Sequence, residues 1–169
     1  GDGLKDWINL LSNNNINTWQ FLPLTQTDSL GSPYSSPSSF ALNPWFLDAN
    51  ELKGNNYIED SEILEKIRYE GQNKNLFKFQ IANELSTLIG DLLFRNWDSQ
   101  SVEVRKEFFI WLENNQWVND YSIFSVLKEQ YNLLPWWEWP EEFRDKDKIK
   151  LDLWTKHNKN KLLIKKLVQ

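Results

Sequence analysis

The chain has 169 residues and a formal net charge of −5, and 40% of its residues are hydrophobic, which is enough apolar material for one ordinary domain or for part of a larger one. It has no cysteine and a single histidine, which excludes disulfides, thiolate sites and histidine-based metal sites, so we expect neither a metal nor another cofactor. No apolar run approaches the roughly 20 residues that span a bilayer, and no signal-peptide pattern is present, so no membrane partner is expected.

Two features of the composition bear on the rest of the molecule. Methionine is absent, even at residue 1; because a translated reading frame normally starts with Met, we expect a fragment of a longer protein. The stretch 141–169 is rich in lysine, whereas the remainder is acidic. A basic tail can bind nucleic acid, but its charges first alternate in sign and no stacking aromatics are interleaved. We therefore interpret it as a solvated helix face and expect no nucleic-acid partner.

The first predicted elements are a helix and a strand. Leu4, Trp7, Ile8 and Leu11 recur at i, i+3, i+4 and i+7, which predicts a helix, and the three asparagines at 13–15 end it. The apolar stretch 16–22 then predicts a buried strand that Pro23 closes, because proline cannot donate to a sheet ladder. A helix, a tight turn and a buried strand are typical of a parallel β/α barrel.

A long loop rich in Ser, Thr, Pro and Gly follows at residues 25–44. Long loops without secondary structure are usually functional or disordered, and the aromatic residues within it, Tyr34 and Phe40, favour an ordered one. A strand that ends in an ordered polar loop is where an α/β protein usually binds its ligand.

Beyond the loop the apolar pattern is helical. Three helix caps are predicted, at Asp48 or Asn50, at Asp60 or Ser61, and at Ser101. The polar stretch 70–78 predicts a connection between helices. The inward-facing residues of three further helices are Ile81, Leu85, Leu88, Ile89 and Leu92; Val104, Phe108, Trp111 and Leu112; and Trp117, Tyr121, Phe124 and Leu127. The stretch 131–135 ends the third of these helices. A last helix begins near Lys146 and continues to the chain end without a stop signal.

Several motifs occur in a specific order. Residues 19–24 read WQFLPL and residues 32–34 read SPY, and Asn43-Pro44 follows; residues 117–128 read WVNDYSIFSVLK and residues 134–140 read LPWWEWP. Single motifs of this kind are weak indicators, but the ordered set resembles the 4-α-glucanotransferases, the amylomaltases or disproportionating enzymes of glycoside hydrolase family 77.

The resemblance implies an α/β fold, a partial TIM (β/α)8 barrel with a mostly α-helical inserted subdomain. We expect an N-terminal barrel segment at residues 1–48, which holds the substrate-binding loop 25–44. A helical insertion is expected at residues 49–145, and residues 146–169 are expected to begin a long helix that leads back to the barrel.

The resemblance also implies a cytoplasmic enzyme that transfers α-1,4-glucan segments between maltooligosaccharides. A retaining mechanism of this kind uses a carboxylate nucleophile and a carboxylic acid/base about 5 Å apart. The family's catalytic carboxylates lie on later strands, beyond Gln169, so no catalytic residue is expected here and the isolated chain should be inactive. Asp28, Asp48, Glu59 and Asp120 match no catalytic motif and are expected at surfaces or caps.

Ser32 and Tyr34 match the Ser and Tyr of the family's SPY motif, so the resemblance implies that they bind substrate around the cleaved bond. A tyrosine ring offers a flat apolar face to a pyranose and a hydroxyl to its rim. The alternative is that Tyr34 packs on its own loop and Ser32 caps a turn, but the ordered motif favours binding. Many members have Asp at the position of Gly31. At the position of Ser29, some members have a Tyr that belongs to a second glucan-binding site. Because this chain lacks that Tyr, the second site is not expected here.

Three tryptophans, Trp136, Trp137 and Trp139, lie between two prolines. They could form a sugar platform, but we interpret them as a connecting turn folded onto the core, with Trp137 the most exposed. His157 is interpreted as a surface residue of a helix. For the whole chain, the alternative to an enzyme fragment is a non-catalytic helical protein that binds carbohydrate or another partner.

Overall fold

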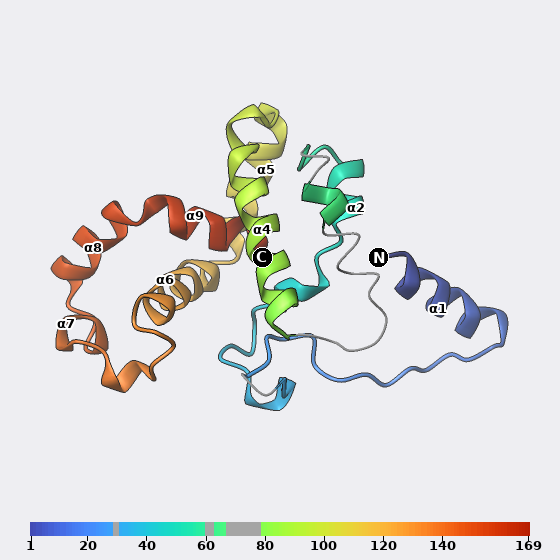
Figure 1. The fold of residues 1–169 in the computed structure, drawn as a ribbon, viewed down its shortest axis with the longest axis horizontal. Helices are drawn as coiled ribbons and strands as arrows, with labels where there is room; N and C mark the ends of the chain where they lie inside the picture. The colour runs from blue at the N-terminus through green and yellow to red at the C-terminus, as the bar shows by residue number, and fades with distance from the viewer. Residues whose placement is uncertain (29–30, 60–62, 67–78) are drawn as a thin grey trace. The chain divides into compact units, whose positions relative to one another are not determined.

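The structure, a computed structural model, describes residues 1–28, 31–59, 63–66 and 79–169 (Figure 1). The chain divides into two compact units, Gly1–Leu92 and Leu93–Gln169. The α-helices with stated bounds are α1 (Asp2–Asn13), α2 (Ala49–Gly54), α4 (Phe79–Arg95), α5 (Val102–Asn114), α6 (Trp117–Gln130), α7 (Glu141–Arg144), α8 (Lys148–His157) and α9 (Lys159–Val168). The 3-10 helices are η1 (Pro33–Ser35), η2 (Pro44–Phe46), η3 (Trp97–Ser99) and η4 (Trp136–Glu138).

The predicted α/β fold, a partial TIM barrel, is wrong, because the described residues contain no strand. The stretch 16–22, predicted as a buried strand, joins no ladder, and its Trp19, Phe21 and Leu22 are 41%, 56% and 56% exposed. The described residues show one isolated antiparallel bridge, between Thr25 and Leu42. A strand is stable only when a neighbouring strand satisfies its backbone N–H and C=O groups, and the described part of the chain supplies none for residues 16–22.

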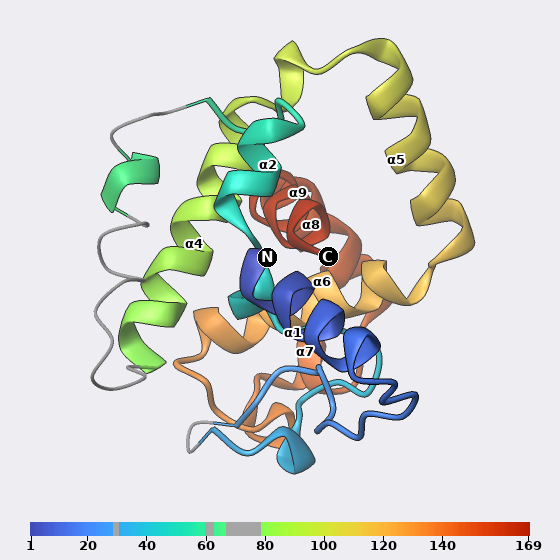
Figure 2. The same ribbon diagram turned by 90° about the vertical axis from the view of Figure 1, so that its right-hand side faces the viewer.

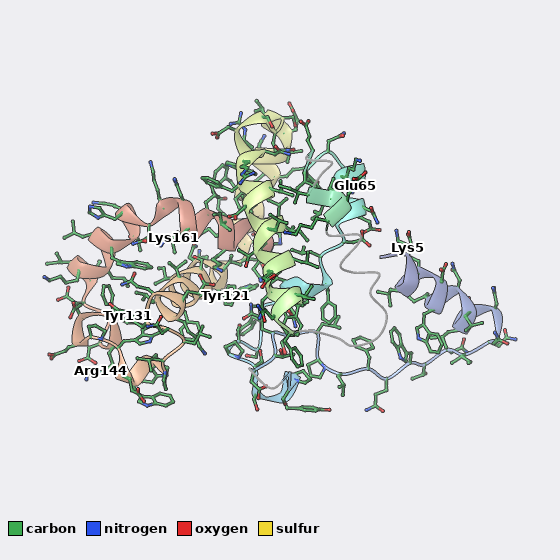
Figure 3. All side chains as sticks on the ribbon, in the orientation of Figure 1. Lys5, Glu65, Tyr121, Tyr131, Arg144 and Lys161 are labelled. Atoms are coloured by element: carbon green, nitrogen blue, oxygen red, sulfur yellow. The ribbon has the colours of Figure 1, made fainter. Side chains whose placement is uncertain are left out.

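In the first unit, α1 forms as predicted and ends at the asparagines. Asn14 donates its side-chain amide to the Leu10 carbonyl (2.8 Å), and Asn15 has a positive φ of 57°, a conformation that asparagine tolerates at a helix end. No residue of α1 is buried. An ion pair between Lys5, labelled in Figure 3, and Glu51 joins α1 to α2.

The rest of the first unit has a small apolar core. Ile58, Leu64, Ile89 and Leu92 are buried, and the last two belong to the predicted stripe of α4. Asp48 caps α2 as one of the two predicted candidates, since its carboxylate accepts the N–H groups of Asn50 (2.9 Å) and Glu51 (3.1 Å). The predicted caps Asp60 and Ser61 and the connection 70–78 lie outside the described residues.

The second unit is built around α6. Its buried side chains, together with Trp139 of the following turn and Leu162 of α9, form a core of Val118, Tyr121, Val126, Leu127, Trp139 and Leu162. α9 lies beside α6 (Figures 1 and 2), and Lys165 pairs with Glu129 at 2.5 Å. The Trp154 indole N–H of α8 donates to Gln130 (3.0 Å), so both C-terminal helices are tied to α6.

Helix ends in this unit follow from local chemistry. Ser101 caps α5 as predicted, accepting the N–H of Val104 (3.2 Å), and α6 ends in the predicted stretch, where Asn132 and Leu133 have positive φ. The single helix predicted from Lys146 onward is instead two, α8 and α9, separated at Asn158. The Asn158 side chain bonds the Trp154 carbonyl (2.9 Å), because asparagine competes with the backbone for hydrogen bonds.

Among the described residues, no helix combines the length and the apolar character that crossing a membrane requires.

Candidate functional site

The candidate site is the loop between Leu24 and Asn43, which is closed at its base. Thr25 and Leu42 form the antiparallel bridge, and the Asn43 N–H donates to the Leu24 carbonyl (2.8 Å). Ala41 is fully buried and Asn43 is 5% exposed. Both ends of the loop are therefore fixed, and the residues between them project from a defined base.

A tight turn brings Asp28 against Ser32 just before the SPY motif. The Asp28 carboxylate accepts the Ser32 N–H (2.9 Å), and the Asp28 N–H donates to the Ser32 carbonyl (3.1 Å). Gly31 closes this turn with a φ of +84°, which glycine adopts without the steric cost that other residues incur. Asp28 is thus a structural carboxylate of the loop.

Ser32 and Tyr34 flank Pro33, so the turn brings both predicted binding residues together. Ser32 occupies the N-cap position of η1, but its hydroxyl makes no capping bond. The Tyr34 side chain is 75% exposed, so it does not pack into its own loop. The Tyr34 ring is therefore solvent-exposed, and the hydroxyl of the half-buried Ser32 does not cap η1.

Two serines brace the second half of the loop. The Ser36 hydroxyl donates to the Ser38 carbonyl (2.6 Å), and the Ser38 hydroxyl accepts the N–H groups of Phe40 (3.2 Å) and Ala41 (3.1 Å). Side-chain bonds of this local kind fix turns. The aromatic residues were the basis for predicting an ordered loop, but Tyr34 and Phe40 are exposed, and the local hydrogen bonds of Ser36 and Ser38 order this half of the loop.

The loop is anchored on α4 by residues that the sequence reasoning missed. The Trp45 indole N–H donates to Asn83 (2.9 Å), and the Trp45 ring lies 5.5 Å from the Phe79 ring, centroid to centroid. A Cβ atom on Gly31 would lie 2.3 Å from Cζ of Phe79, so the turn before SPY sits directly on this ring. In the sequence, Phe79 stands two residues before the apolar stripe that begins at Ile81, and this local position gives no sign of its contact with Trp45.

The four carboxylates considered and rejected as catalytic groups have structural or surface positions. Glu59 and Asp120 are exposed. Burial would raise the pKa of Asp48, but the N–H groups of Glu51 and Asn50 and the amino group of Gly1 hold it below its ordinary value. The described residues contain no group of three or more His, Cys, Asp or Glu side chains that could hold a metal ion.

The tryptophans of the LPWWEWP turn divide into two kinds. Trp139 is 6% exposed, as the core interpretation predicted, whereas Trp136 and Trp137 are 53% and 60% exposed. The core prediction is therefore wrong for Trp136, and Trp137 is the most exposed of the three, as expected. His157 is a surface residue of α8 as predicted, with Nδ1 2.7 Å from the Leu153 carbonyl.

Comparison with known proteins identifies the chain's relatives. The family model described as 4-alpha-glucanotransferase matches residues 1–169. A 4-alpha-glucanotransferase of Clostridium butyricum is 31% identical over 126 residues, which are 75% of this chain and 25% of that protein.

Two further relatives carry the same description. The one from Synechocystis sp. is 24% identical over 170 aligned residues, covering 100% of this chain and 33% of the relative. The one from Thermus thermophilus is 29% identical over 150 residues, covering 87% of this chain and 28% of the relative. The chain therefore spans a quarter to a third of the length of these curated relatives.

Proposed function

The chain belongs to the 4-alpha-glucanotransferase family, and from that premise we propose that it is the sugar-binding part of an enzyme that transfers α-1,4-glucan segments between maltooligosaccharides. The loop 25–44 holds the substrate next to the scissile bond. The reaction is a retaining double displacement, and the two catalytic carboxylates lie beyond Gln169, in a cytoplasmic enzyme. The predicted organisation into residues 1–48, 49–145 and 146–169 is part of this proposal.

The observation that carries the proposal is the exposed Tyr34 ring on an anchored turn. A pyranose has one apolar face of C–H groups, which stacks on a flat aromatic ring, and a rim of hydroxyls, which needs donors and acceptors. Tyr34 offers the face and one hydroxyl, and Ser32, whose side chain does not cap η1, offers a second. Because the turn is fixed by Asp28 and by Phe79, little conformational entropy is lost when a sugar binds.

In a double displacement, the first carboxylate forms a covalent glycosyl-enzyme and a sugar hydroxyl then attacks it in place of water. Transfer therefore requires that an acceptor sugar be held beside the intermediate more effectively than water. A preformed aromatic surface favours this, because it binds the acceptor's apolar face and orients its hydroxyl. This is the role that we assign to the Ser32–Tyr34 turn.

The proposal is tested by sugar binding to the 169-residue chain. Saturation-transfer difference NMR with maltotriose should show contact to the wild-type chain, a signal several-fold weaker for Tyr34→Ala, and an intermediate signal for Tyr34→Phe. Phe46→Ala is the matched control, because Phe46 is also exposed (61%) and lies outside the turn. Equal signals from the wild type and Tyr34→Ala would refute the assignment.

A second prediction separates binding from catalysis. The isolated chain should not disproportionate maltotriose, because the nucleophile and the acid/base are absent from residues 1–169 under this proposal. Chromatography of the sugars after long incubation with purified chain checks it. Glucose and longer oligomers above the level of a protein-free blank would show that a catalytic pair lies within the chain.

A further inference from the structure

The turn between α6 and α7 presents an unusual pair of tryptophans. Trp136 and Trp137 are more than half exposed, and Leu133 and Leu134 beside them are 65% and 44% exposed. Single exposed apolar residues are normal on a protein surface, but a contiguous apolar patch marks a binding surface. This patch lies within the second unit, apart in sequence from loop 25–44.

The turn that carries the pair is held in place. The Trp139 indole N–H donates to the Leu134 carbonyl (3.1 Å), and its ring packs against Phe124 at 5.6 Å and Tyr131 at 6.0 Å, centroid to centroid. The prolines at 135 and 140 restrict φ on either side. One buried tryptophan thus anchors the turn, and the other two are displayed on it.

The two exposed rings form a corner. Their centroids are 5.9 Å apart and their planes meet at 81°, so one ring can stack on a flat ligand while the other borders it. Neither indole N–H has a hydrogen-bond partner among the described residues, so both remain available as donors. Tryptophan combines an apolar face with a polar edge in this way.

The charges around the corner indicate the ligand class. Residues 133–143 contain three glutamates and no lysine or arginine, and Glu138, Glu141 and Glu142 are exposed. Arg144, labelled in Figure 3, is bound to the Asp145 carboxylate through Nε (2.7 Å) and Nη2 (3.0 Å). This acidic segment disfavours anionic ligands, although Lys128 lies over the Phe124 ring at 5.6 Å. Carboxylates accept hydrogen bonds from the hydroxyls of a neutral sugar.

We propose that Trp136 and Trp137 form an accessory glucan-binding platform, made of other residues than the Ser32–Tyr34 turn. One pyranose of an α-1,4-glucan stacks on an exposed indole, the second indole borders it, and the neighbouring glutamates accept its hydroxyls. The assignment to α-1,4-glucan rests on the proposed function. A second contact with the same glucan chain raises the local concentration of that glucan at the enzyme.

Binding of maltoheptaose to the 169-residue chain, measured by isothermal titration calorimetry, tests the platform. Trp137→Ala and Trp136→Ala should each raise the Kd about ten-fold, and the double substitution should remove measurable binding at this site. Trp7→Ala is the matched control, since Trp7 is also partly exposed (42%) but lies on α1. Tyr34→Ala should leave binding of maltoheptaose to the platform unchanged. A failure of the Ser32–Tyr34 site can therefore be distinguished from a failure of the platform.

A second experiment uses the wild-type chain, so it does not depend on a variant that folds. N-bromosuccinimide oxidises exposed indoles, and mass spectrometry identifies which tryptophans have reacted. Maltoheptaose should protect Trp136 and Trp137 and should not protect Trp7 or Trp19. The proposal is overturned by unchanged affinity in a folded double variant, by an equal loss in Trp7→Ala, or by protection of all four indoles. Equal protection by cellohexaose, a β-linked glucan, would overturn the assignment to α-1,4-glucan.

Discussion

At the scale of single residues, Tyr34 is where binding and stability can be separated. In a complete enzyme that contains these 169 residues, Tyr34→Ala removes a stacking contact worth about 0.5–1.5 kcal/mol beyond area burial and a hydrogen bond worth roughly 0.5–1.5 kcal/mol. We expect kcat/KM for maltooligosaccharides to fall about ten- to a hundred-fold, and Tyr34→Phe to lose only the hydrogen-bond share. The melting temperature should hardly change, because the ring is 75% exposed. Unfolding with unchanged turnover per folded molecule would make Tyr34 a packing residue.

Gly31 tests how rigidly the same turn is held. Gly31→Ala places a methyl group 2.3 Å from Cζ of Phe79 in a residue whose φ is +84°, so we expect a loss of about 1–3 kcal/mol of stability. Urea denaturation measures the loss, and amide hydrogen exchange should localise it to residues 31–43. The control is Gly3→Ala in α1, where no atom lies within 4 Å of the new Cβ and alanine should stabilise the helix by about 0.5–1 kcal/mol. A Gly31→Ala chain as stable as the wild type would show that the turn does not rest on Phe79.

At the scale of elements, α2 depends on the Asp48 cap. Asp48→Ala should destabilise this helix by about 1 kcal/mol, whereas Asp48→Asn should retain the cap. The folded-state pKa of Asp48 lies below its ordinary value of 3.8, so its stabilising effect is complete above that pH and is lost as the pH falls below it. Hydrogen exchange of the α2 amides from pH 6 to pH 2.5 measures this. The wild type should lose protection of the α2 amides as the pH falls, and Asp48→Asn should lose less. An equal loss of protection in the two would assign the effect to another group.

The elements also show how much the sequence could predict. Helices with a strong apolar period and a local cap were predictable, such as α1 and α5, because both signals lie within a few residues of one another. The stretch 16–22 has the composition of a buried strand, but strand formation depends on a partner that composition does not reveal. The division at Asn158 was missed because the pattern of α8 and α9 is helical on both sides of it.

The sequence nominated the residues of the candidate site, which stay a prediction, but it did not reveal the contacts that hold the loop in place. The motif order singled out Ser32 and Tyr34 and located the loop. The contacts of Trp45 with Asn83 and Phe79 join residues 34 to 38 positions apart in the chain, and no local signal encodes such a pair. The burial of Trp139 and the exposure of Trp136 likewise depend on which ring reaches Phe124 and Tyr131, a tertiary outcome.

At the scale of the whole molecule, apolar exposure is concentrated in α1 and the segment that follows it. Leu4, Trp7, Ile8 and Leu10 of α1 are 42–53% exposed, and Phe21 and Leu22 are each 56% exposed. Exposed apolar side chains in such number promote association. We expect the isolated chain to self-associate through it, with slow amide exchange concentrated in the second unit, around α6 and α9. Size-exclusion chromatography with light scattering should show that Leu10→Glu shifts the chain toward monomer. The control is Ile149→Glu, because Ile149 on α8 is also exposed (74%); this substitution should not shift the chain toward monomer. A clean wild-type monomer with a sharp cooperative melt would contradict this prediction. An equal effect of both substitutions would also contradict it, because the added charge alone would then account for the change in oligomeric state.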